Sequence, residues 1–120
     1  MARTELVTMT IAASAAVSNG FGLDGRRPVG IFKPATWTGA DISFEVSTDG
    51  STWVKVIDSA GALLKITGVS ATVAEYYVVT EASDLIAAPH IRVVSTNTAS
   101  EVDVNQDAAR TLTLVCVPLP

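Results

Sequence analysis

Two β-rich segments separated by an Asp-Gly turn constrain the fold of this chain more than any other feature. Residues 42–46 (Ile-Ser-Phe-Glu-Val) alternate apolar and polar side chains, which is the period of a strand with one buried face. Residues 52–57 (Thr-Trp-Val-Lys-Val-Ile) are rich in β-branched and aromatic side chains, which favour strands. Asp49 and Gly50 lie between them, and glycine adopts the positive φ of a tight turn without steric cost. We therefore predict a β-hairpin, with Ile42, Phe44 and Val46 facing the core.

The same strand signals recur along the chain, with turn residues between them. A helical period of about 3.6 residues is not sustained in any segment. The sequence therefore predicts a single all-β domain over residues 1–120, an antiparallel β-sandwich or a jelly-roll-like barrel of about eight short strands. The order of the strands stays open. The other six predicted strands are 5–11, 28–32, 63–66, 76–80, 91–95 and 110–117. Alternation places Val7, Met9 and Ile11 on one face of the first of these strands, and Leu112, Leu114 and Cys116 on one face of the last.

Glycine and proline limit where these strands begin and end. Pro28 has no N–H to donate to a ladder, so we expect it at the first position of its strand or on an edge. Residues 18–25 contain three glycines and predict a loop. Residues 83–87 predict one helical turn, capped by Ser83 and ended by Pro89.

The charge of the chain argues against nucleic acid as a partner. Its 120 residues include 8 basic and 12 acidic side chains, a formal net charge of −4. Nucleic-acid binding needs clustered Lys and Arg, and the tightest basic group here is the pair Arg26 and Arg27. Only 17% of the residues are charged, which is low for a soluble domain. Either the faces of the sandwich are rich in Ala, Ser and Thr, or partners cover part of the surface.

We expect no membrane partner for this chain. No apolar stretch reaches the ~18–20 residues that cross a bilayer. The first residues include Glu5 and lack the basic segment and the continuous apolar run of a signal peptide. These features predict a protein that is made and folded in a cytoplasm.

Few residues in this sequence are candidates for catalysis. His90 is the single histidine and Cys116 the single cysteine, so the usual zinc ligand sets are missing. A serine triad would need His90 as its base, and no serine lies in a Gly-x-Ser-x-Gly turn. We interpret His90 as a packing or capping residue and Cys116 as a buried thiol. We therefore expect no enzyme activity, no catalytic or metal-binding residue and no cofactor.

Three other patterns are better explained by structure than by chemistry. Residues 20–25 match Gly-x-Gly-x-x-Gly, but a strand and not a helix is predicted to follow, which excludes a dinucleotide site. Residues 101–107 alternate acidic and polar side chains without the EF-hand pattern, and predict a solvated loop or edge strand. Acidic side chains that a glycosidase pair would need are expected on solvated strand faces and turns. These are Asp41, Glu45, Asp49 and Asp58.

The two tryptophans are the best candidates for contact residues. Trp53 follows the Asp-Gly turn, and Trp37 precedes the strand that begins at Ile42. Each is either a core residue or a contact anchor, because large aromatic side chains serve both purposes. The candidate contact residues are Trp37, Trp53, Arg26 and Arg27.

Three blocks of sequence, in this order, resemble small β-sandwich virion proteins of tailed bacteriophages and related gene transfer agents. The resemblance covers residues 27–117, and the combined order of the blocks is more specific than the Asp-Gly hairpin alone. The blocks are Pro34-x-x-Trp37, then Phe44-x-x-Ser47-x-Asp49-Gly50-x-x-Trp53, then Asn105-Gln106 followed by Arg110 before the last strand.

This resemblance implies a structural role on a virion, as a capsid decoration, cement or head-spike-base protein. It implies binding to the major capsid protein and to copies of itself as a trimer, and it brings no active site. Residues 1–5 and 118–120 are candidate docking termini. The alternatives are a tail-associated virion protein, or a carbohydrate-binding or host-attachment module in which Trp37 and Trp53 stack on sugar rings.

Overall fold

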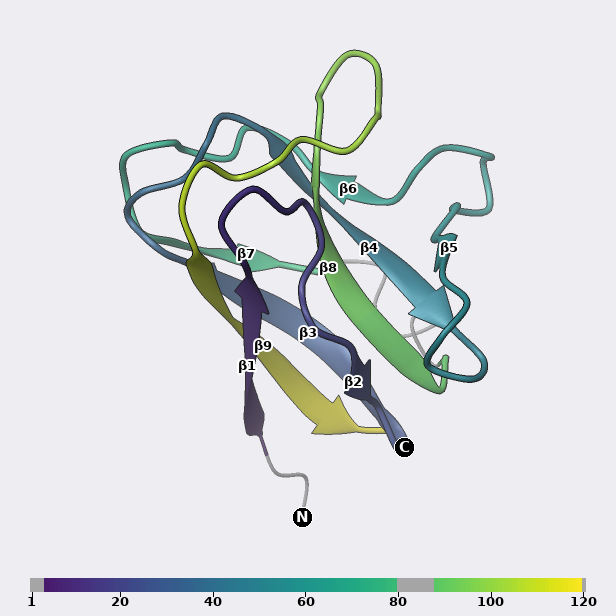
Figure 1. The fold of residues 1–120 in the computed structure, drawn as a ribbon. Coiled ribbons are helices and arrows are strands. Elements are labelled where there is room, and N and C mark those ends of the chain that lie inside the picture. The colour runs from purple at the N-terminus through teal and green to yellow at the C-terminus, as the bar shows by residue number, and fades with distance from the viewer. Residues whose placement is uncertain (1–3, 80–87, 120) are drawn as a thin grey trace.

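The computed structural model describes residues 4–79 and 88–119, and in these ranges it contains nine β-strands and no helix. The all-β prediction is therefore confirmed, and Figure 1 shows the course of the chain. The strands are β1 (Glu5–Ile11), β2 (Phe21–Gly22), β3 (Arg26–Lys33), β4 (Asp41–Ser47), β5 (Val54–Lys55), β6 (Lys65–Ile66), β7 (Glu75–Val78), β8 (His90–Thr96) and β9 (Arg110–Pro118).

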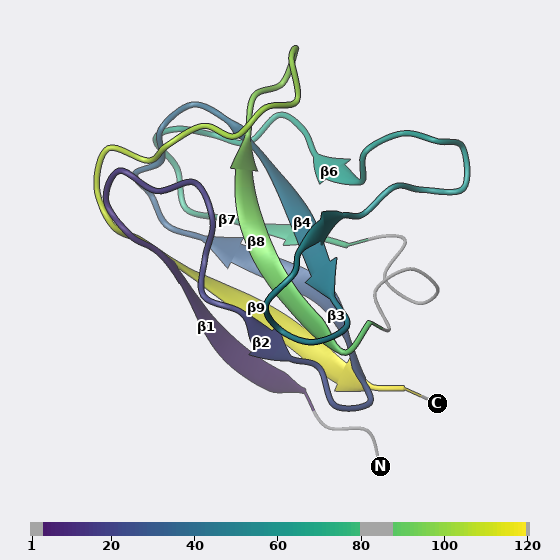
Figure 2. The same cartoon turned by 45° about the vertical axis from the view of Figure 1, so that its right-hand side comes forward.

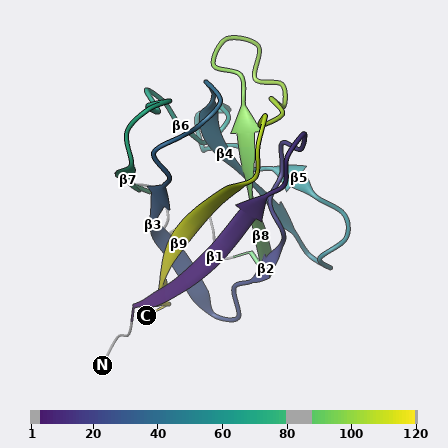
Figure 3. The ribbon, with the colours of Figure 1, turned by 60° about the vertical axis from the view of Figure 1, so that its left-hand side comes forward.

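The strands form two antiparallel sheets packed face to face, so the fold is a β-sandwich and not a closed barrel. The four-stranded sheet has the order β1-β9-β3-β7, and the five-stranded sheet has the order β2-β8-β4-β5 with β6 also on β4. β5 and β6 pair with successive parts of β4 and together act as one interrupted strand. With that count, the interleaved order is that of a jelly roll. Figures 2 and 3 show β1 and β9 side by side at one margin of the four-stranded sheet.

The hydrophobic core lies between the two sheets. Phe44 is 1% exposed, and burial of such a side chain stabilises the fold by about 1.5–3 kcal/mol. The inward faces predicted for the first and last strands are confirmed, and Val46 packs against the core from a partly buried position. The core residues of the five long strands are Val7, Met9, Ile11, Ile31, Ile42, Phe44, Ile91, Val93, Leu112, Leu114 and Cys116.

The predicted hairpin is confirmed, although its second strand is shorter than expected. Val46 pairs with Val54 and Glu45 with Lys55, and the chain then leaves β4. The connecting loop is longer than a two-residue turn, and Gly50 adopts the expected positive φ of 80°. The segment predicted at 63–66 is likewise a strand only at Lys65–Ile66.

Two strand boundaries differ from the predictions because pairing partners decide them. Residues 18–25 are not wholly a loop, since β2 lies within them and pairs with the start of β8. β3 begins at Arg26, so Pro28 is the third residue of its strand and not the first. Pro28 is tolerated there because it lies at a β-bulge and β7 reaches only as far as Gly30.

The described parts of the two predicted docking termini join or adjoin the four-stranded sheet. Glu5 is already part of β1 and pairs with Cys116, while Pro118 ends β9 opposite Arg26. The amide of Leu119 also donates to the Gly25 carbonyl at 2.8 Å. The helical turn predicted at residues 83–87 lies outside the described residues, as do residues 1–3 and 120.

Candidate contact surface

The outward side chains of the four-stranded sheet form a nearly uncharged surface, which we call the outer face of that sheet. Residues opposite each other in an antiparallel ladder point to the same face, so the register defines its members. Phe32 lies on the inner strand β3, and Tyr76 lies next to it on the edge strand β7. The two rows that cross all four strands are Leu6–Val115–Gly30–Val78 and Thr8–Thr113–Phe32–Tyr76.

Large apolar side chains are exposed on this outer face. Leu6 on β1 is 66% exposed and Val78 on β7 is 62% exposed, while Phe32 and its neighbour Tyr76 are about half exposed. The ring centroids of Phe32 and Tyr76 are 4.6 Å apart, within the range of attractive aromatic pairs. The Tyr76 ring lies over Gly30, where an added Cβ would overlap its hydroxyl group. Gly30 therefore lets the aromatic pair lie against the sheet.

The two adjacent arginines point to opposite faces of β3. Arg27, opposite Val117, is the one charged side chain on the outer face within the described residues. Its buried Nε has no hydrogen-bond partner there. Arg26 turns the other way, donates from Nε to the Leu23 carbonyl at 2.8 Å, and pairs with Glu5. The structure thus separates the pair, and only Arg27 belongs to the outer face of the four-stranded sheet.

The outer face of the five-stranded sheet is charged, and its charges pair with one another. Arg92 on β8 faces Glu45 on β4, with Nη2 at 2.6 Å and Nε at 2.8 Å from the same carboxylate oxygen. Lys65 on β6 lies 3.0 Å from Glu101 and 3.9 Å from the buried carboxylate of Asp41. These contacts leave little unpaired charge on this side for a partner to use.

The loop between β4 and β5 places Trp53 on this charged face. The guanidinium carbon of Arg92 is 4.6 Å from the indole centroid, a cation–π contact. Asp49 accepts hydrogen bonds from the amides of Thr52 and Ser51, both at 2.9 Å. These hydrogen bonds lower the pKa of Asp49 to about 2. The Asp-Gly block of the resemblance therefore has a structural task, which is to hold this loop.

Trp37 is a core residue, which decides between its two predicted roles. It is 2% exposed, and its Nε1 donates to the Ala40 carbonyl at 3.1 Å. A buried indole cannot stack on a sugar ring, so the carbohydrate-binding alternative loses one of its two platforms. The other, Trp53, is partly buried and already has Arg92 on its ring.

The third block of the resemblance also has a structural task. Gln106 is fully buried, and its Oε1 accepts from the Thr38 amide at 2.8 Å and from Arg110 Nε at 3.1 Å. Its Nε2 donates to Ser95 Oγ at 2.8 Å. Arg110 also pairs with Asp107 at 2.5 Å. The network ties the β3–β4 connection to β8 and β9, and a satisfied buried network of this kind makes a fold rigid.

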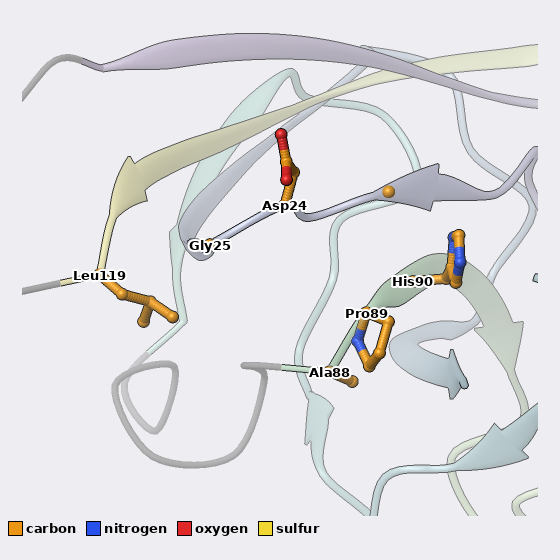
Figure 4. Close-up of a pocket in the computed structure, with 7 residues that line it drawn as sticks. Asp24, Gly25, Ala88, Pro89, His90 and Leu119 are labelled. Carbon is orange, nitrogen blue, oxygen red and sulfur yellow. The ribbon is translucent and has the colours of Figure 1, made fainter. Parts of the chain in front are cut away.

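A pocket of about 460 Å³ opens beside the start of β8. Figure 4 shows that the Asp24 carboxylate and the His90 ring do not point toward one another. The His90 ring instead packs near Gly50, where an added Cβ would lie 3.4 Å from it. The described residues of the pocket thus offer no paired acid and base. They are Gly22, Asp24, Gly25, Ala88, Pro89, His90 and Leu119.

Metal-binding and thiol chemistry have no assembled site in the described part of the chain. No group of three or more His, Cys, Asp or Glu side chains there could hold a metal ion. Cys116 is fully buried, and burial raises the pKa of its thiol to about 11, as expected for a structural cysteine. Within the same residues, no helix has the length and apolar character needed to cross a membrane.

The outer face of the four-stranded sheet contains none of the predicted contact residues except Arg27. Tryptophan and arginine guided the prediction, whereas the exposed apolar side chains of this face are Leu6, Phe32, Tyr76 and Val78. A signal was present, because the outward positions of β1 and β9 carry Leu, Thr and Val in place of charges. The low charge content indicated such a surface, but only the pairing of strands shows where it lies.

Comparisons with protein-family models, with curated proteins and with solved structures found no match to this chain.

Proposed function

We propose that this chain is a structural protein of a virion, a decoration or cement subunit that binds the major capsid protein and has no catalytic task. The observation that carries the proposal is the outer face of the four-stranded sheet. Aromatic residues are enriched and acidic residues and lysine are depleted at the centres of protein interfaces. The row through Phe32 and Tyr76 crosses all four strands without a charged side chain, and it carries its two aromatic residues on β3 and β7.

The rest of the molecule supports the same role. The jelly-roll order occurs in capsid proteins and in lectins, so the fold alone favours neither function. The three blocks that resemble virion proteins build the rigid parts of this fold, namely the Trp37 connection, the Asp49 loop and the Gln106 network. A rigid subunit loses little conformational entropy on docking, and an uncharged face has few charged groups whose desolvation would oppose binding.

A pair of matched variants tests this proposal. Val78 on the outer face of the four-stranded sheet is 62% exposed, and Val54 on the edge of the other sheet is 58% exposed. Val78→Glu should weaken binding to shells of the encoding phage about tenfold or more, because an unpaired buried charge costs about 2–5 kcal/mol. Val54→Glu should leave binding unchanged. Co-sedimentation of labelled protein with purified shells measures both.

Two results would contradict the proposal. One is that the unmodified protein does not sediment with shells at any concentration. The other is that both glutamate variants bind as well as the unmodified protein, which would exclude the outer face of the four-stranded sheet as the docking surface. Far-UV circular dichroism of each variant shows that the comparison is made between folded proteins.

A further inference from the structure

β1 is the longest strand at an edge of either sheet, whereas β7, at the opposite edge of the same sheet, has only four residues and begins with the charged Glu75. Exposed edge strands attract other strands, and natural proteins limit this with short strands, lysines, prolines or bulges. β5 and β6 are two residues long and carry Lys55 and Lys65, and β2 is equally short. β1 has seven residues without lysine or proline, and its pairing with β9 runs without a register shift.

Hydrogen bonds within the chain cover only the last part of the β1 edge. The Thr10 amide donates to Asn19 Oδ1 at 2.8 Å, and the Thr10 carbonyl accepts from the Asn19 amide at 3.3 Å. The backbone groups of Thr10 therefore point away from β9. Because these directions alternate along a strand, those of Leu6 and Thr8 point the same way. Neither has another partner as far as the structure describes the chain.

We propose that two copies of this chain join through β1, antiparallel about a two-fold axis at Leu6. Backbone groups in a row require a strand as their partner, and a two-fold axis pairs a strand with itself in the antiparallel direction. Asn19 already hydrogen-bonds to the backbone of Thr10, so the described residues with free outward backbone groups are Thr4, Leu6 and Thr8. Pairing centred on Leu6 uses all three, with Thr4 of each copy opposite Thr8 of the other.

The side chains of β1 fit this register. Leu6 is 66% exposed and would gain an apolar partner in the Leu6 of the other copy. Glu5 is paired with Arg26 inside its own chain and would lie opposite Val7, so no like charges meet. The two four-stranded sheets would become continuous, and their outer faces would merge into one surface. This inference does not depend on the virion role, and it replaces the trimer that the resemblance implies.

Removal of one outward amide tests the pairing. Thr8→Pro deletes an N–H that makes no bond to β9, so the fold should persist while the dimer dissociates to monomers. Leu6→Lys, which places like charges at the axis, gives the same test without a change of backbone. Thr8→Val is the matched control and should remain dimeric. Light scattering coupled to size exclusion over a range of concentrations gives the mass of each.

Cysteine cross-linking tests the position of the axis. Under mild oxidation Leu6→Cys should form a disulfide-linked dimer, because residue 6 of each copy lies opposite its counterpart. Thr10→Cys, on the same face of the same strand, should stay uncross-linked. A monomer or trimer for the unmodified protein overturns the proposal. So does a dimer that survives both Thr8→Pro and Leu6→Lys, or cross-linking at residue 10 as fast as at residue 6.

Discussion

The outer faces of the two sheets differ in the contacts that their side chains make: charged side chains pair on one face, and apolar side chains stay exposed on the other. On the five-stranded sheet, Arg92 contacts Glu45 and the indole of Trp53, so its charge is used within the molecule. On the four-stranded sheet, Phe32 and Tyr76 contact each other and are otherwise exposed to a large degree. A partner that docks on the first face must break or bury ion pairs, which is costly. A partner on the second face only displaces water from apolar groups.

The two faces share one detail of packing, an aromatic ring that lies over a glycine. Trp53 lies over Gly20, where an added Cβ would be 2.8 Å from the indole, and Tyr76 lies over Gly30. The first ring belongs to a loop held by Asp49, and the second to an edge strand. The same device thus stabilises a loop on one sheet and shapes an exposed surface on the other.

The largest expected effect concerns the ion pair on the charged face. Glu45→Ala leaves Arg92, which is partly buried, without its carboxylate and should lower the free energy of unfolding by about 1–3 kcal/mol. Val78→Thr, on the other outer face and away from β1, should change it by less than about 0.5 kcal/mol. Urea denaturation measures both. Equal losses would show that the two faces contribute to stability in the same way.

A smaller effect is expected from the glycines under the aromatic rings. Gly30→Ala should displace Tyr76 and alter the outer face, with a change in unfolding free energy below about 1 kcal/mol because only the end of a side chain must move. Shell binding should weaken. Gly20→Ala should shift the fluorescence of Trp53 and leave shell binding intact. If Gly20→Ala weakened shell binding and Gly30→Ala did not, the docking surface would be the outer face of the five-stranded sheet.

The smallest effect is a pH dependence that belongs to the loop over the charged face. Asp49 has a folded pKa of about 2, below the ordinary value of 3.8 for this side chain. A depressed pKa contributes stability that is present above 3.8 and is lost as the pH falls toward 2. Asp49→Asn should flatten this part of the acid unfolding curve, followed by circular dichroism. An unchanged curve would mean that the loop does not contribute to acid stability.

The sequence allows the strands to be predicted better than their partners. Alternation identifies β1, β4 and β9 and their inward residues, because a buried face imposes a period of two. It does not identify β2, since Phe21 and Gly22 lie in a glycine-rich stretch and become a strand only beside β8. The break between β5 and β6 is predicted, but the strands on either side of it are shorter than their sequence patterns indicate, because each pairs with only two residues of β4. Pairing is a long-range property that local patterns do not contain.

The candidate surface was the least predictable part. Tryptophan and arginine are conspicuous in a sequence, yet Trp37 is buried and Arg26 is bound to Glu5. Leu6, Phe32 and Val78 are individually ordinary, and they form a surface only when register places them on one face. Their common property is a lack of charge at outward positions. Such a property becomes visible only after the strand order is known.

The central position of β9 has a consequence for how this protein is made. The last strand of the chain lies between β1 and β3, which are among the first. While the nascent chain leaves the ribosome, the strand that pairs with both β1 and β3 has not yet been made. Their apolar side chains stay exposed until residues 110–118 are available. Late contacts between distant segments slow folding and prolong exposure to aggregation. Loss of β9 would therefore remove an inner strand of the four-stranded sheet and leave β1 and β3 without their shared partner.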